Sequence, residues 1–268
     1  GSTPLGGGAN SVSTTLQTKT HTSDNVIAAA GTSVVTISSN SSCAGLRLTF
    51  WITRTEAAAY LHSGAPPIVL TYLDAKGDSS GSTGAHTYNA AFGAASANRY
   101  ILVGASITNP SVVDTIGGVP AVELFRVQAG TGTKVAAWYL ARVPTGTSGN
   151  ITVTSPGGGI NWIGGVVVYS LISVSTPTLI DAVTGTNGVT NSWPMTAKSG
   201  SVALVLLAQG TPGKVWSGGV TLDVALTFGG TGQIESASTH ALIAGASITP
   251  SWNFGLAPAA ASAAIVIK

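Results

Sequence analysis

The sequence predicts an all-β protein, an antiparallel β-sandwich preceded by a small N-terminal unit that contains strands and one short helix. Between residues 99 and 171, short runs rich in Val, Ile, Thr, Tyr and Trp alternate with breaks that contain Gly, Pro or Asn. The breaks recur about every eight to twelve residues, which is typical of antiparallel strands joined by tight turns. A chain of 268 residues can bury a substantial core without disulfides or metals.

Charged residues are rare in this chain. They make up 7% of it, against roughly 25% in ordinary globular proteins. The chain is 44% hydrophobic, whereas disordered chains contain few apolar residues, so we expect it to fold. A surface made of Ser, Thr, Asn, Gly and Ala offers little electrostatic repulsion between copies. We therefore expect a homo-oligomer or a subunit packed in a larger assembly.

The composition also argues against several kinds of partner. The 11 basic and 9 acidic residues are scattered singly, without the basic cluster that nucleic-acid binding needs. The longest apolar run, residues 202–208, is far shorter than the roughly 18 residues of a membrane span. Cys43 is the single cysteine, so neither an intramolecular disulfide nor a cysteine-based zinc site is available. We expect no nucleic acid, membrane, cofactor or metal partner.

The chain divides into three parts. Residues 1–19 are mostly Gly, Ser and Thr, which cannot offset their ordering entropy by burial, and predict a flexible arm. Residues 20–64 predict a small attachment unit, because apolar and polar residues alternate over 46–53 as in a half-buried strand. The proline pair that comes next favours a boundary near Gly64. The sandwich then occupies residues 65–268.

One helix is expected, at residues 54–62. Thr53 and Glu56 have the spacing of a capping box, in which both side chains satisfy free amides of the first turn. The good helix formers EAAAYLH follow, and Gly64 ends the segment.

Strands are predicted wherever β-branched and aromatic residues cluster between turn signals. The predicted strands are 68–73, 100–108, 112–116, 119–127, 134–143, 150–154, 163–174, 179–183, 202–209, 221–228, 233–235, 242–248 and 263–267. In 221–228, strict alternation predicts that Leu222, Val224, Leu226 and Phe228 face the core together. One short echo, VGASITNPS at 103–111 and AGASITPS at 244–251, predicts two strands leading into equivalent turns, but it is no repeat architecture.

Asp74 and Asp78 flank a Lys-Gly pair and have two interpretations. Carboxylates at this spacing around a glycine turn can converge on a calcium ion. The intervening Lys76 and the lack of further carboxylates favour a solvated turn that binds no ion.

Nothing in the sequence is a recognisable catalytic motif. There is no G-x-S-x-G elbow, H-E-x-x-H helix or Walker loop, and the four histidines are far apart in the sequence. A glycosidase needs two carboxylates about 5 to 10 Å apart, and sequence does not give separations. The acids available for such a pair are Asp114, Asp181, Asp223, Glu123 and Glu235. Lone acids near strand ends normally satisfy turns or pair with a base, so we expect a protein that is not an enzyme.

The tryptophans are the most informative residues. Trp138 lies inside an apolar run and is expected in the core. Four others, Trp162, Trp193, Trp216 and Trp252, lie beside Asn, Ser, Gly or Pro. Indole rings stack on the apolar faces of sugars while Asn binds hydroxyls. The candidate carbohydrate-binding residues are Trp162, Asn191, Trp193, Trp216, Trp252 and Asn253. The alternative is that these rings seal the ends of the sandwich or bury at a subunit contact, where aromatic residues are also enriched.

Several segments together resemble a known group of proteins. The lead-in AFGAASANRY, the motif VDTIGGVPA, the hairpin WYLARVPTGTSGNITVTS and the strand GVVVYSL look like the jelly-roll β-sandwiches of tailed-phage virion proteins. Similar modules belong to head fibres, spikes and receptor-binding proteins, including those of gene transfer agents. The resemblance covers residues 85–175 and transfers no binding residue position by position.

The resemblance implies a jelly-roll protein on the surface of a virion or phage-like particle, outside the cell. We expect its partners to be cell-surface polysaccharide, through the candidate tryptophan and asparagine residues, and capsid or other virion proteins. A purely structural capsid decoration or spike-base subunit is the alternative. A polysaccharide depolymerase is a third possibility.

Overall fold

The computed structural model describes residues 68–80, 84–108, 110–128, 134–155, 162–185, 190–208, 215–228, 232–253 and 261–268. They belong to one compact unit, Pro66–Lys268. Every regular element in these ranges is a strand, and the strand pairs are antiparallel, which confirms the all-β prediction. No helix there is long and apolar enough to cross a membrane. The expected arm (1–19), attachment unit (20–64) and helix (54–62) lie outside the described residues.

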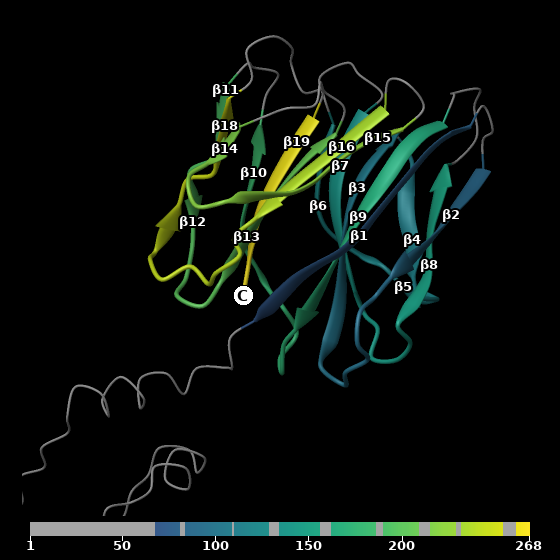
Figure 1. Ribbon diagram of the computed structural model, residues 1–268, viewed down its shortest axis with the longest axis horizontal. Helices are drawn as coiled ribbons and strands as arrows, with labels where there is room; N and C mark the ends of the chain where they lie inside the picture. Colours follow the sequence, from purple (N-terminus) through teal and green to yellow (C-terminus); the bar gives the residue numbers. More distant parts are fainter. Residues whose placement is uncertain are drawn as a thin grey trace, which may run out of the picture. The chain divides into compact units, whose positions relative to one another are not determined.

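Two five-stranded inner sheets form the centre of this unit (Figure 1). The first inner sheet has the order β1 (Val69–Ser80), β9 (Trp162–Ile172), β3 (Arg99–Thr108), β7 (Lys134–Arg142) and β6 (Val122–Gln128). The second inner sheet has the order β10 (Leu179–Gly185), β19 (Ala261–Ile267), β13 (Val202–Ala208), β16 (Gly232–Ser238) and β15 (Thr221–Phe228).

Smaller outer sheets cover the far face of each inner sheet. The four-stranded outer sheet covers the first inner sheet and has the order β2 (Gly84–Ala91), β8 (Ser148–Ser155), β4 (Val112–Ile116) and β5 (Val119–Pro120). The second inner sheet is covered by two sheets. The three-stranded sheet is β11 (Thr190–Ser192), β18 (Ser251–Asn253) and β14 (Val215–Ser217), and the two-stranded sheet is β12 (Met195–Thr196) with β17 (Ser247–Ile248).

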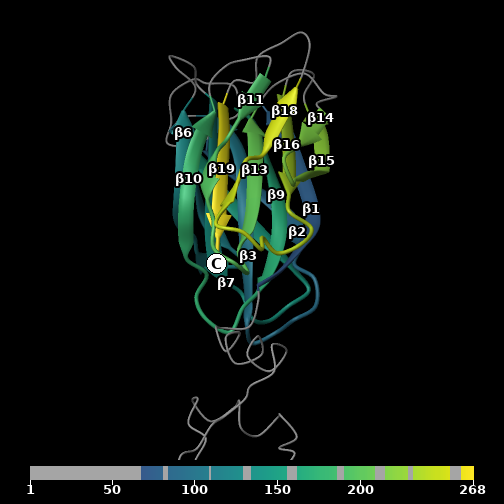
Figure 2. The same ribbon diagram turned by 90° about the vertical axis from the view of Figure 1, so that its left-hand side faces the viewer.

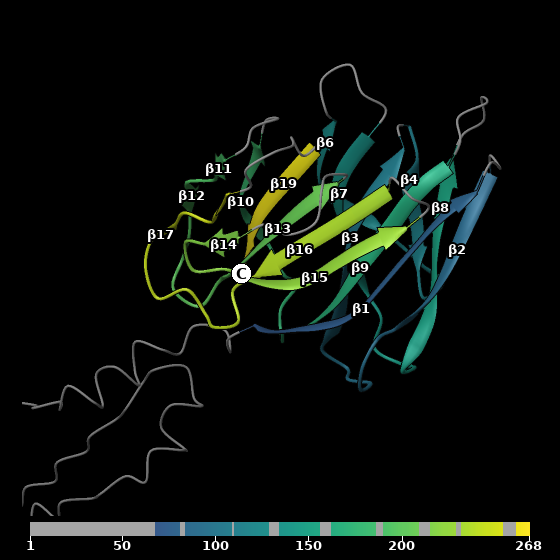
Figure 3. The same cartoon turned by 45° about the horizontal axis from the view of Figure 1, so that its top comes forward.

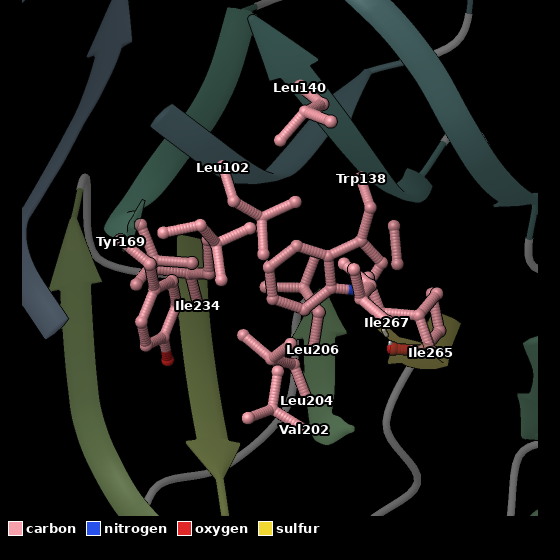
Figure 4. Close-up of a cluster of buried hydrophobic side chains, with 14 of the residues drawn as sticks. Leu102, Trp138, Leu140, Tyr169, Val202, Leu204, Leu206, Ile234, Ile265 and Ile267 are labelled. Carbon is pink, nitrogen blue, oxygen red and sulfur yellow. Dashed lines mark hydrogen bonds between the residues drawn. The ribbon is translucent and has the colours of Figure 1, made fainter. Parts of the chain in front are cut away.

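The expected two-sheet sandwich is therefore a stack of four layers, which lie from left to right in Figure 1; Figure 2 views the stack face-on, with the three-stranded sheet in front. An apolar core lies between each pair of neighbouring layers. The central core, between the inner sheets, contains Trp138, Tyr169 and Leu206 (Figure 4). Phe92 and Tyr139 belong to the core under the four-stranded outer sheet. The third core lies between the second inner sheet and its two outer sheets.

Burial on both faces explains the most apolar strands. All residues of β3, β13 and β19 are buried, because each of these strands lies in the middle of an inner sheet with a layer on either side. Such strands have continuous apolar runs without alternation. The run at 202–208 that sequence analysis singled out is therefore a two-sided core strand.

Strict alternation fails in β15. The register shifts between Leu222 and Val224, which is a β-bulge, and an extra residue reverses which face the side chains occupy. Val224, Leu226 and Phe228 pack on the central core as predicted, but Leu222 is 41% exposed and does not join them. The predicted strand 242–248 is also wrong in length, since only Ser247–Ile248 is strand and Ile243 makes an isolated bridge.

Arg99, at the start of β3, is fully buried without a carboxylate partner among its hydrogen bonds. Its guanidinium donates instead to backbone carbonyls of two loops. The acceptors are Val143 (2.7 Å), Phe92 (3.1 Å), Gly93 (2.9 Å), Ala94 (2.9 Å), Thr145 (2.6 Å) and Gly146 (2.7 Å). A buried polar group left without such partners costs free energy, so this one side chain fixes the β2–β3 and β7–β8 loops together.

We predict that Arg99→Met lowers the free energy of unfolding by at least about 3 kcal/mol, because six loop carbonyls lose a donor that is itself fully buried. Denaturant unfolding measures the change. Arg142→Met is the matched control, since Arg142 is exposed and donates to one carbonyl, that of Ala97, so the loss is expected within about 1 kcal/mol. Equal losses in the two variants would contradict the role given to Arg99.

Candidate functional site

The three-stranded sheet brings together four of the six candidate residues. Its register places Trp252 opposite both Asn191 and Trp216, which makes one row across the sheet from residues far apart in the sequence. The adjacent row places Asn253 opposite Thr190 and Val215. Sequence analysis named these residues separately, but their adjacency follows from a register that no local pattern contains.

Trp216 of this row stacks on Trp193, the residue that follows β11. Their ring centroids are 6.4 Å apart and the rings are 17° from parallel. Trp193 belongs to the third core and is fully buried, whereas Trp216 is partly exposed and packs against that core. As a direct sugar contact, Trp193 is therefore a wrong assignment, because a ring without exposed surface cannot stack on a ligand. Its role is to support Trp216 from beneath.

Prolines explain why this outer layer is split into two sheets. Pro194 and Pro250 interrupt the two strands at the same height, since neither can donate to a ladder. The Trp193 amide donates to the Pro250 carbonyl at 2.9 Å, which holds the two breaks together.

The turn that follows β14 packs against the break at Pro250. A Cβ on Gly218 would collide with the Thr249 carbonyl, so only glycine fits there.

The three-stranded sheet carries neutral polar groups. Its strands, TNS, SWN and VWS, contain no charged residue. The hydroxyls of Ser217 and Ser251 are 2.8 Å apart on neighbouring strands, and Val215 beside them is 70% exposed. Sequence analysis missed these serines. The available signal was that all three segments place a serine next to a tryptophan.

The indole nitrogens distinguish this aromatic pair from the core tryptophan. Trp138 is fully buried and donates from Nε1 to the Ala263 carbonyl at 3.0 Å, so its predicted core position is confirmed. Nε1 of Trp193 and Nε1 of Trp216 are buried and have no hydrogen-bond partner among the described residues. A buried indole N–H normally finds an acceptor.

Trp162 lies apart from the other candidates. It is the first residue of β9 and pairs with Ser80 of β1, in the first inner sheet. The structure does not bring it to the three-stranded sheet.

Asp74 and Asp78 do not form a turn, as both interpretations of the sequence supposed, but lie within β1. A bulge at Leu73 places the Asp74 carboxylate where it accepts from the amides of Ala75 (2.8 Å) and Ala91 (3.0 Å). Asp78 accepts from the Tyr88 hydroxyl at 2.7 Å. Both carboxylates thus accept hydrogen bonds from donors within the protein. In the described ranges, His, Cys, Asp and Glu nowhere form a group of three or more suited to a metal ion.

The five acids considered for hydrolysis lie on five different strands. Asp114 accepts from the Thr154 hydroxyl, and Glu123 pairs with Arg126 at 2.9 Å. Asp181 accepts from the amides of Ala182 and Thr196, at 2.8 and 2.7 Å. Asp223 lies in β15 and Glu235 in β16. Asp114, Asp181 and Asp223 each accept from or pair with a group on another strand or loop, whereas Glu123 and Glu235 have partners within their own strands.

Asp223 and Glu235 are the most buried of these acids. The Asp223 side chain is 3% exposed, accepts from the Tyr169 hydroxyl at 2.8 Å and lies 2.9 Å from Nε2 of His240. Burial, together with the Asp223 charge, raises the pKa of Tyr169 well above its ordinary value. Glu235 is 1% exposed and accepts from the Gln233 amide at 2.9 Å. The Asp223 contact thus joins β15 to Tyr169 of β9, whereas the Glu235 contact lies within β16.

The chain matches no protein-family model, no curated protein and no solved structure. Its function is therefore inferred from its own residues and their geometry.

Lys134 gives a pH-dependent prediction. Burial at the start of β7 lowers its pKa from 10.5 to about 8. Between these values the unfolded chain binds more protons at Lys134 than the folded chain, so the free energy of unfolding rises as pH increases from about 8 to 10.5. Urea unfolding at several pH values should show this rise in the wild type.

Two variants isolate this contribution. Lys134→Met removes the titrating group, and Lys134→Arg keeps a charge throughout the window, so both should reduce the rise relative to the wild type. An unchanged pH profile in both variants would show that Lys134 is not its source.

Proposed function

We propose that this protein is a surface protein of a virion or phage-like particle that attaches to host cell-surface carbohydrate through the three-stranded sheet. The observation that carries the proposal is the row of Asn191, Trp252 and Trp216, with Asn253 in the next row. Indole and amide groups at adjacent positions are the combination that sugars use, the ring for C–H faces and the amide for hydroxyls.

The electrostatics of this sheet favour a neutral, hydroxyl-rich ligand. Because its strands contain no charged residue, they offer nothing to pair with a phosphate or a cationic peptide. The paired hydroxyls of Ser217 and Ser251 belong to the next row and add neutral hydrogen-bonding groups on the opposite face of the same sheet. In this proposal Trp216 contacts the sugar, and Trp193, stacked beneath it, limits the movement of the ring and so the entropy that binding would cost.

We further propose that residues 69–172 form a jelly roll, the fold implied by the resemblance to phage virion proteins. In a jelly roll of eight strands, the first, eighth, third and sixth strands form one sheet, and the second, seventh, fourth and fifth form the other. When β5 and β6 are counted as one strand, the orders β1-β9-β3-β7 and β2-β8-β4-β5 agree with this arrangement. Capsid and other virion proteins are the partners that such a subunit would have.

The second candidate function is that of a purely structural subunit, a capsid decoration or spike base. The stacking of Trp216 on Trp193 supports it, since the two rings close one side of the third core and need no ligand to explain them. In that case the aromatic pair stabilises the subunit, and the sheet above it contacts other copies.

We predict that Trp216→Phe weakens binding to host polysaccharide at least fivefold, because a smaller ring stays on Trp193 but loses stacking area. Isothermal titration with purified surface polysaccharide, chosen from a glycan array, measures the affinity. Val215→Ala is the matched control, since Val215 is the preceding residue and 70% exposed, and its affinity should equal that of the wild type.

The outcomes separate the two functions. If the wild type binds no glycan on the array, the carbohydrate proposal fails. If Trp216→Phe binds as tightly as the wild type, the sugar site lies elsewhere. If assembled particles lose the subunit in this variant while adsorption of the remaining particles is unchanged, the structural function is favoured.

A further inference from the structure

We infer that residues 69–267 are two copies of one β-sandwich fold, and that the inner sheets are the surfaces through which the two halves recognise each other. The first half has the inner order β1-β9-β3-β7-β6 and the second half has β10-β19-β13-β16-β15. Taken in chain order, the inner strands β1, β3, β6, β7 and β9 of the first half match β10, β13, β15, β16 and β19 of the second. Replacing each strand by its match converts the first order into the second without exception. The outer orders β2-β8-β4 and β11-β18-β14 correspond in the same way.

Equivalent aspartates support the duplication. Asp74 in β1 and Asp181 in β10 both follow a bulge, within the similar tripeptides LDA and IDA. Each carboxylate accepts from the amide of the next residue at 2.8 Å. The other oxygen accepts from an amide of the outer layer, that of Ala91 at 3.0 Å or Thr196 at 2.7 Å. The same device therefore joins inner to outer layer in both halves.

Equivalent turns give a second, independent agreement. β4 and β14 are both followed by a pair of glycines with positive φ, at 61° and 78° for Gly117 and Gly118 and at 72° and 89° for Gly218 and Gly219. Positive φ at both central residues is the type I′ hairpin geometry that favours glycine.

The short sequence echo does not reflect this duplication. Its first copy, 103–111, connects β3 to β4, whereas its second copy, 244–251, leads into β18, which is the counterpart of β8. That prediction was wrong.

The halves also pack symmetrically. β3 packs against β13, its own counterpart. β1 packs against β15 and β10 against β6, and likewise β9 against β16 and β19 against β7. Exchanging each strand for its counterpart leaves this set of contacts unchanged, which is the property of an isologous two-fold interface. Figure 3 shows the two inner sheets lying face to face.

The surface between the halves is apolar and satisfies its own polar atoms. The side chains drawn in Figure 4 come from both inner sheets and interdigitate in the central core. Trp138 of the first half donates to the Ala263 carbonyl of the second, and the Tyr169 hydroxyl reaches Asp223 and Ser236 across the interface. A half that stood alone would expose this whole face, so its partner is the other half.

The linker between the halves bonds to each of them locally, through Thr176 to Tyr100 and through Thr178 to Lys268. It comprises residues 173–178, and Val174, Ser175 and Thr176 are exposed. The central core buries a large apolar cluster from both inner sheets, so in this inference the core, and not the connecting peptide, holds the halves together. This inference is independent of the carbohydrate proposal.

The test is to cut the linker in the intact protein. A protease recognition sequence is inserted between Val174 and Ser175 of the full chain, the folded protein is cleaved, and the product is analysed by size-exclusion chromatography under native conditions. We expect the two fragments, 1–174 and 175–268, to elute together at the position of the uncut protein. Elution as separate fragments, or precipitation of either one, would overturn the inference.

Substitutions in the cleavable protein locate the surface. Leu206→Asp places a charge in the central core and should make the cleaved fragments separate, whereas Thr184→Asp, on the exposed part of β10, should leave them together. Should Leu206→Asp not fold, Leu206→Ala serves instead, with dissociation of the cleaved complex followed on dilution. It should dissociate at a concentration at least tenfold higher than the unsubstituted complex, and equal dissociation would contradict the assigned surface.

Discussion

Burial of both faces of the two inner sheets is the constraint on which the rest of this structure depends. A sheet with a layer on either side has no solvent face, so its central strands are mostly apolar, and any polar side chain on them must find its partners inside the protein. β3, β13 and β19 are buried along their whole length, and their polar residues are Arg99, Ser106, Thr108 and Ser262. Much of the low charge of the chain follows from this layering, because four stacked layers leave few strand faces on which charged residues can stay hydrated.

The same constraint determines what happens to the polar groups that remain inside. Arg99 gives its donors to six loop carbonyls, and Asp74 and Asp181 accept amides of two layers at once. The edges are handled similarly. Each edge strand of the inner sheets, β1, β6, β10 and β15, contains a register shift. Bulges of this kind discourage edge-to-edge pairing with other chains, so contacts with other copies would use sheet faces or loops.

The candidate site arises where the second half departs from the first. In the first half, β2 and β8 pair without interruption, whereas the corresponding strands of the second half are broken beside Pro194 and Pro250. The break places Trp193 in the core and Trp216 against it. A fold used twice can keep one copy regular while the other acquires an aromatic pair and a neutral three-stranded sheet. The proposed carbohydrate recognition thus belongs to the second half.

The sequence by itself determined the strand content, most strand positions, the break at 117–118 between two predicted strands and the core position of Trp138, because these depend on alternation, turn chemistry and residue size within a few neighbouring residues. Only the tertiary structure decided that there are four layers, that Leu222 leaves the core face at a bulge, that β1 continues through Asp74 and Asp78, and that Asn191, Trp216 and Trp252 share a row. Each of these depends on which distant strands pair and in which register, and a local pattern is the same for every such pairing.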